Sequence, residues 1–290
     1  MTKEKKDSLM LDAKMRGKLE KAIDEMNLFD DDLMSKVFDG NIEAAELILK
    51  IILQRDDIKV LSVKGQVDMK NPYANGRNIR IDVYAIDSKG ERFNVEVQRD
   101  EKGAHIRRAR YNGSMLDTRM LKKKQDFKEL KDAYVIFICR HDKFGKGLPV
   151  YHVDKVIRET GESYDDGAHI IYLNGIYKGD DDFGRLAHDF NCTNPDEIYY
   201  KPLAEGVRHF KEEEEGRDGM CESFEKLAKE YAEGVAAQIT EQVKEETQAE
   251  TKLSMVKELM HNMKLTLDQA LDGCGIQGDE RIAITKALQK

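Results

Sequence analysis

Two acidic residues, Asp82 and Glu96, flank a short turn in a stretch whose hydrophobic residues alternate with polar ones. The segment RIDVYAIDSKGERFNVEVQ has the period-two pattern of a β-hairpin, and Gly90 fits the left-handed position of a three-residue turn. In the register that this turn sets, Asp82 lies directly opposite Glu96. A shift of one residue would instead place Asp82 opposite Val95 and mix the polar and apolar faces.

Two carboxylates that face each other across a hairpin repel, so the sequence must supply something that offsets this repulsion. One explanation is a solvated polar face on which both acids point into water. The other is a hard divalent cation, because Mg²⁺ binds one or two carboxylates together with waters and phosphate oxygens. Such a cation activates a water and polarises a phosphodiester. Gln98, which shares this face, can orient that water, so the chemistry expected here is phosphodiester hydrolysis.

The segment after the hairpin is strongly basic. Between Arg99 and Lys124 nine basic residues stand against three acidic ones, a local charge of +6 in a chain whose net charge is -8. A solvated helix face is the commoner explanation of such a run, but its position directly after the acidic strand favours contact with phosphates. The residues expected to bind nucleic acid are Arg99, Arg107, Arg108 and Arg110.

The elements that position these residues follow from periodicity. The order is helix, three antiparallel strands, helix and buried strand, which predicts an α/β fold with a mixed sheet and the core order αβββαβ. Asn41 is expected to cap the main early helix, NIEAAELILKIILQR, and AYVIFIC reads as a strand buried on both faces. Two further strands, LPVYHV and AHIIYL, and a short helix, DDFGRLAHDF, are predicted to follow.

The chain divides by composition into a helical extension over 1–27, a core domain over 28–205 and a charged helical tail over 206–290. The tail begins with an acidic run and continues with apolar residues at helical spacing, which favours an amphipathic helix that docks on the core, forms a homo-oligomer or contacts DNA. Thr266 and Gln269 fit a capping box. The last segment is interpreted as a helical cap, with a helix-turn-helix reader as the alternative. The apolar positions of the long helix are Phe224, Leu227, Ala228, Tyr231, Val235, Ile239 and Val243.

Composition excludes several classes of protein. No stretch approaches the roughly 18 apolar residues of a membrane span, and the N-terminus lacks the apolar segment of a secretory signal, which predicts a cytoplasmic protein. The four cysteines form no CxxC pair, which argues against a disulfide framework and against a thiolate zinc site. Cys139 and His141 are close in sequence, but two ligands without a second pair are weak support for zinc.

The acidic residue in RIDVYA, the E-x-Q of NVEVQRD and the helix with RRARYNGSML together resemble the PD-(D/E)XK nuclease superfamily. Over roughly residues 28–200, the chain is similar to the bacterial PD-(D/E)XK nuclease family transposases, also described as recombination-promoting nucleases. The segments FDDDLMSKVFDG, IRIDVYAIDSKGERFNVEVQRD and YVIFICRHDKFGKGLPVYHV carry this similarity.

The resemblance implies a restriction-endonuclease-like core and a DNA endonuclease associated with a mobile element or recombination. It implies Mg²⁺ as cofactor, with Mn²⁺ as a substitute, and Asp82 and Glu96 as metal ligands. An acidic residue on the first core helix often joins them; Glu46 is the candidate and Glu43 the rival.

The chain departs from the family motif at two positions. Ile81 replaces the proline, which carries no ligand, and Gln98 replaces the lysine, so that the motif cannot supply a positive charge there. The alternatives to a DNA endonuclease are a catalytically degenerate DNA-binding or assembly protein of the same fold and an RNA-directed nuclease.

Overall fold

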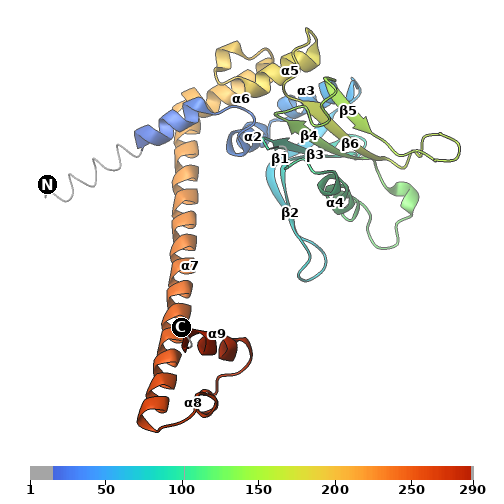
Figure 1. Ribbon diagram of the computed structural model, residues 1–290. Helices are drawn as coiled ribbons and strands as arrows, with labels where there is room; N and C mark the ends of the chain where they lie inside the picture. The colour runs from blue at the N-terminus through green and yellow to red at the C-terminus, as the bar shows by residue number, and fades with distance from the viewer. Residues whose placement is uncertain (1–15, 101, 289–290) are drawn as a thin grey trace, which may run out of the picture. The chain divides into compact units, whose positions relative to one another are not determined.

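The computed structural model describes residues 16–100 and 102–288, with the side chains at all of these positions except 225, 227–249 and 279. The described chain divides into two compact units, one that ends at Glu222 and one that begins at Ser223. The first unit contains the sheet and the second contains the last helices (Figure 1). Residues 16–25, at the start of the described chain, are helical.

One six-stranded mixed sheet organises the first unit, in the order β1-β2-β3-β4-β6-β5. The first three strands are antiparallel, β3, β4 and β6 are parallel, and β5 returns antiparallel at the edge. The predicted mixed sheet is therefore confirmed, and LPVYHV and AHIIYL extend it. The strands are β1 Val60–Met69, β2 Ile79–Asp87, β3 Arg92–Gln98, β4 Ala133–Cys139, β5 Val150–Val153 and β6 Ala168–Asn174.

Helices cover both faces of this sheet, with α4 on one face and the remaining helices of the unit on the other (Figure 1). The helix α4 forms the crossover that the parallel pair β3 and β4 requires. Asn41 caps α3 by accepting a hydrogen bond from the Ala44 amide at 3.0 Å, as expected. The helices of this unit are α2 Asp31–Phe38, α3 Ile42–Leu53, α4 Ile106–Asp117, α5 Asp182–Asn191 and α6 Lys201–Glu212.

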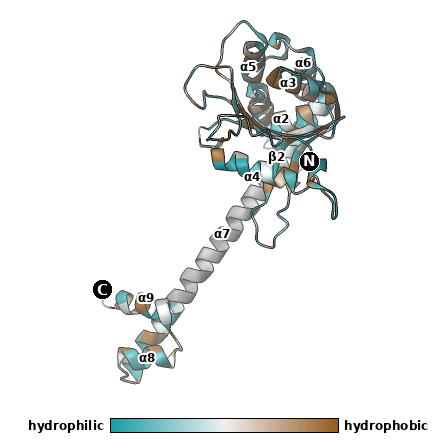
Figure 2. Cartoon of the chain, turned by 90° about the vertical axis from the view of Figure 1, so that its right-hand side faces the viewer, coloured by the Kyte–Doolittle hydropathy of each residue, from teal (hydrophilic) through white to brown (hydrophobic). Residues whose placement is uncertain are grey.

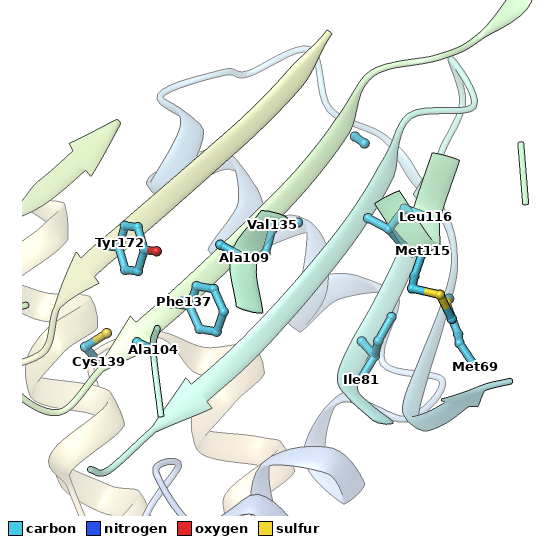
Figure 3. Packing of buried hydrophobic residues seen from close by; sticks show 11 residues of the cluster. Met69, Ile81, Ala104, Ala109, Met115, Leu116, Val135, Phe137, Cys139 and Tyr172 are labelled. Carbon is cyan, nitrogen blue, oxygen red and sulfur yellow. The ribbon is translucent and has the colours of Figure 1, made fainter. Parts of the chain in front are cut away.

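The core lies on both sides of the central strand β4, every residue of which is buried. On the α4 side, Phe137 of β4 stacks on Tyr172 of β6 with ring centroids 5.4 Å apart. Figure 3 shows these rings on the sheet face against which Ala109 and Met115 of α4 pack. On the opposite face lies α3, which Figure 2 colours largely as hydrophobic. The strand buried on both faces is therefore confirmed.

A buried lysine at the end of α6 ties distant parts of the first unit together. Lys211 is only 3% exposed, and its ammonium group donates hydrogen bonds to the carbonyls of Asp24 at 2.9 Å, Met26 at 2.5 Å and Thr193 at 2.6 Å. Among the described residues no carboxylate pairs with this ammonium, so the three carbonyls satisfy its charge. Helix α6 thus belongs structurally to the unit that contains the sheet.

The second unit consists of the later part of α7, Glu214–Asn262, with α8, Leu267–Gly273, and α9, Gly278–Leu288. Its small core contains Val256, Leu271 and Ile284. The predicted capping box is confirmed, because Thr266 and Gln269 exchange side chain to backbone hydrogen bonds. The side chains from Leu227 to Val243 of the predicted oligomerisation helix lie outside the described residues.

Within the described part of the chain, no helix combines the length and the hydropathy needed to cross a bilayer.

Candidate functional site

Asp82 lies where the pairing of β2 with β3 ends. The two strands pair from Ile86↔Arg92 to Val83↔Val95, in the predicted register, and Gly90 has the predicted left-handed conformation with φ of +83°. Beyond this point the Asp82 carboxylate takes the place of a ladder carbonyl and accepts a hydrogen bond from the Val97 amide at 3.0 Å. The half-buried carboxylate is therefore fixed between the two strands.

Glu96 has a different environment, although it follows on the neighbouring strand. Its side chain is fully buried, one carboxylate oxygen is paired with the guanidinium of Arg108, and the other accepts a hydrogen bond from the Asn112 amide at 3.2 Å. Both partners come from α4, which lies over this face of the sheet. In this structure the Glu96 carboxylate is thus engaged by protein groups.

A cavity of about 690 Å³ opens in front of Asp82. Its walls come from the start of α2, the ends of β2 and β3, and the loop that leads to α4. The wall is strongly charged, with an acidic side at Asp31 and Asp82 and a basic side at Lys102 and Arg108. Glu96 is not part of its lining, because Arg108 covers it. Gln98 lines the cavity.

Burial and mutual repulsion disturb the acidity of both predicted ligands. Burial raises the pKa of Asp82 above its usual range, and the charge of Asp31 raises it further. Burial also raises the pKa of Glu96, followed by the charge of Asp82, while Arg108 acts in the opposite direction. Both carboxyl groups therefore hold a proton more readily than usual, and a cation bound beside them would favour their ionised form.

The oxygen ligands at this site suit a hard cation that takes only a few of its ligands from the protein. Among the described residues no group of three or more His, Cys, Asp and Glu side chains is arranged to hold a metal. Mg²⁺ commonly takes only one or two carboxylates and keeps several waters, for which the cavity at Asp82 has room. Asp82 is open to such an ion. Glu96 can bind the same ion only if its carboxylate gives up the ion pair with Arg108.

The backbone of Gly103 lies against the side chain of Gln98. A Cβ atom at position 103 would stand 1.7 Å from the Gln98 side-chain oxygen, so that only glycine fits at this place without moving the amide. The loop before α4 therefore sets the position of Gln98 in the cavity.

The predicted phosphate-binding arginines fall into three groups. Arg99 donates to the Phe29 carbonyl at 2.8 Å and pairs with Asp30, so it holds the start of α2 against β3. Arg108 is paired with Glu96. Arg107 and Arg110 are exposed and line a second cavity of about 720 Å³ next to the first.

The structure places the predicted helix acid away from the cavity. Glu46 pairs with Lys50 at 2.7 Å and accepts a hydrogen bond from the Val60 amide at 3.0 Å, while Glu43 is exposed and does not line the cavity. Asp31, at the start of α2, occupies the cavity wall instead. Its only signal in the sequence is its place in the segment FDDDLMSKVFDG, which carries the family similarity.

Comparison with known proteins identifies one family. Residues 42–175 match the family model of the PD-(D/E)XK nuclease family transposases, which confirms the resemblance over this segment. No curated protein and no solved structure gives a significant match. Nucleases of the PD-(D/E)XK type generally use divalent metals.

Proposed function

We propose, with the PD-(D/E)XK nuclease family match over residues 42–175 as the premise, that this chain is a Mg²⁺-dependent DNA endonuclease that acts with a mobile element or in recombination. The observation that carries the proposal is the Asp82 carboxylate, fixed at the open end of the β2–β3 ladder in a charged cavity. Its raised pKa and the cationic cavity beside it support metal-assisted phosphodiester hydrolysis.

Each residue of the site has a separate role in the proposed hydrolysis. A bound Mg²⁺ would supply Lewis acidity to the phosphodiester and help to activate a water. Asp82 would hold the ion from β2, and Glu96 would hold it from β3 if its ion pair with Arg108 were released. The Gln98 amide orients the attacking water, because it lines the same cavity and cannot itself act as a base. Mn²⁺ is expected to substitute, since it accepts the same oxygen donors.

The remaining charged residues position the substrate and the fold. Arg107 and Arg110 are exposed on α4 beside the cavity, so they contact phosphates of the DNA backbone without reading its sequence. Arg99 contributes indirectly by fixing the start of α2, where Asp31 lies. Asp31 takes the place assigned above to Glu46 as the acidic residue of a core helix, and its charge acts on Asp82.

The assembly and location of the protein are also proposals. A homo-oligomer through α7 is supported by the spacing of apolar residues in its sequence. All four cysteines are free, and Cys139, Cys192 and Cys221 are buried, which supports the cytoplasm as its location.

Incubation with supercoiled plasmid tests the proposal. Nicked or linear product is expected with Mg²⁺ or Mn²⁺ and is expected to be absent with EDTA or Ca²⁺, because Ca²⁺ binds oxygen ligands in a looser geometry. Gel electrophoresis over a time course measures the products. Equal cleavage in EDTA, or none with either active metal from a folded protein, would overturn the proposed function.

The pairing of Arg108 with Glu96 and the presence of Gln98 favour one second candidate, a catalytically degenerate DNA-binding or assembly protein. Binding of DNA by a folded protein that never cleaves it would select this candidate. Competition between DNA and RNA for a labelled substrate separates the DNA-directed from the RNA-directed nuclease.

A single methyl group at Gly103 is expected to reduce activity without unfolding the protein. In Gly103→Ala the new Cβ displaces the Gln98 amide, which is the flexible end of a side chain, so the rate is expected to fall roughly tenfold. The free energy of unfolding is expected to change by less than about 1 kcal/mol. Initial cleavage rates and urea unfolding measure both effects.

The matched control is Gly113→Ala in α4, where the new Cβ would meet its nearest neighbour, a methyl group of Val135, at an ordinary 3.8 Å. This variant is expected to retain the full rate and to gain up to about 1 kcal/mol of stability, because alanine favours the helix. Equal loss of rate in both variants would refute the positioning of Gln98 by Gly103.

A further inference from the structure

The second cavity, of about 720 Å³, is formed by two elements far apart in the sequence. One wall is α4, with Arg107 and Arg110, and the other is the start of β2 with the turn before it, where Arg77 and Arg80 lie. It shares Lys102, Gly103 and Arg108 with the cavity in front of Asp82, so the two cavities are continuous. We call this second cavity the arginine groove.

The turn that joins β1 to β2 is fastened to α4. The Tyr111 hydroxyl of α4 donates a hydrogen bond to the Arg77 carbonyl at 2.6 Å and accepts one from the Asn71 side chain at 2.7 Å. Within the turn, Asn71 donates its amide to Asn78 at 2.8 Å and accepts from the Tyr73 amide at 2.9 Å. These bonds fix the distance between the two walls of the groove.

The charge of the arginine groove is of one sign. Its lining includes Arg77, Arg80, Lys102, Arg107 and Arg110 and, within the described residues, no aspartate or glutamate. In the described part of the chain, Arg77, Arg107 and Arg110 form no ion pair with a carboxylate. Cations left without acidic partners on two facing walls are suited to a polyanion that passes between them.

We propose that the β1–β2 turn is the second jaw of a nucleic-acid clamp, in which Arg77 and Arg80 contact the sugar-phosphate backbone opposite Arg107 and Arg110 and lead it toward Asp82. This inference rests on the proposed function and extends it. It assigns a substrate-binding role to Arg77, Arg80 and Tyr111, and it names the ligand as the backbone of a DNA strand that continues past the cavity at Asp82.

Binding of a labelled DNA duplex, followed by fluorescence anisotropy in Ca²⁺ over a range of salt concentrations, tests the clamp without requiring cleavage. The double variant Arg77→Gln/Arg80→Gln is expected to bind at least about tenfold more weakly near 100 mM salt. Its slope of log K against log salt is expected to become shallower by about 2, which corresponds to two lost phosphate contacts. The control Arg158→Gln changes an exposed arginine outside the groove and is expected to leave both values unchanged.

A second variant distinguishes the effect of the position of the β1–β2 turn from the effect of the charge of its arginines. Tyr111→Phe removes the hydroxyl that fastens the turn but keeps every cation, so the affinity is expected to fall about threefold to tenfold, corresponding to the loss of a hydrogen bond worth roughly 1 kcal/mol. The salt slope is expected to stay near that of the wild type. Restoration of the slope by Arg77→Lys/Arg80→Lys would show that charge is what the groove supplies.

The outcomes distinguish this inference from the proposed function. If the double glutamine variant binds with wild-type affinity and slope, or if Arg158→Gln weakens binding equally, the clamp is refuted even when Mg²⁺-dependent cleavage is observed. If the wild type never cleaves DNA but its binding depends on Arg77 and Arg80, the clamp stands and the catalytic proposal fails.

Discussion

Asp82→Asn is expected to lower the rate of Mg²⁺-dependent plasmid cleavage by about a thousandfold or more. Asparagine keeps an oxygen that can accept the Val97 amide, so the strands retain their arrangement, but the charge that holds the metal is lost. A thousandfold loss corresponds to about 4 kcal/mol of transition-state stabilisation. Initial rates of nicking at saturating Mg²⁺ measure the effect.

The same substitution is expected to stabilise the metal-free protein at pH 8 by about 1–2 kcal/mol, because the folded state no longer holds an ionised carboxylate that burial and Asp31 disfavour. Thermal unfolding in EDTA measures this gain. Glu46→Gln is the control, since its carboxylate pairs with Lys50 away from the cavity, and it is expected to cleave at the wild-type rate. Full activity of Asp82→Asn would remove the central residue of the proposed site.

Arg108→Gln is expected to make the stability of the metal-free protein strongly dependent on pH. The Glu96 carboxylate has no exposure to solvent, and the Arg108 guanidinium is the cation paired with it. Without this partner, the pKa of Glu96 is raised further by burial and by the charge of Asp82. Ionisation of Glu96 in the folded protein then costs about 3 kcal/mol relative to the wild type.

The direction follows from proton linkage. A carboxyl group whose pKa is raised by folding binds a proton in the folded state that the unfolded state has released, so stability falls as pH rises above the unfolded value of about 4.3. Since the pKa of Glu96 is already raised to about 8 in the wild type, the variant is expected to match the wild type near pH 5 and to be less stable at about pH 9.5, above that pKa. Urea unfolding in EDTA at both values measures the difference. Adding Glu96→Gln to Arg108→Gln is expected to remove the pH dependence of the loss of stability. An equal loss of stability at both pH values would contradict this explanation.

The local geometry of the site could be predicted from sequence because strands have a period of two and the turn fixes their register. The glycine at position 90 and the alternating residues on both sides were sufficient to place Val83 opposite Val95. The uninterrupted apolar run of β4 likewise predicted its burial on both faces. These inferences use only neighbours along the chain.

The rest of the site depends on how distant elements pack. Glu46 and Asp31 lie on the successive helices α3 and α2, and only the packing of α2 at the open end of the β2–β3 ladder decides between them. In the same way, Arg108 could not be separated from Arg107 and Arg110 before it was known which face of α4 meets Glu96. The hydrogen bonds from Tyr111 to the β1–β2 turn join residues more than thirty positions apart, for which the sequence gives no local signal.

The three carbonyls bound by Lys211 set a limit on how far the chain can be shortened without weakening the unit that contains the sheet. A premature stop codon before position 211 removes the ammonium, so the carbonyls of Asp24, Met26 and Thr193 lose the donor that they share. A hydrogen bond at such a partly exposed place contributes about 1 kcal/mol, against a net stability of about 5–15 kcal/mol for a typical domain. Shortened genes that still encode Lys211 are therefore expected to give a more stable sheet-containing unit than genes that end before it.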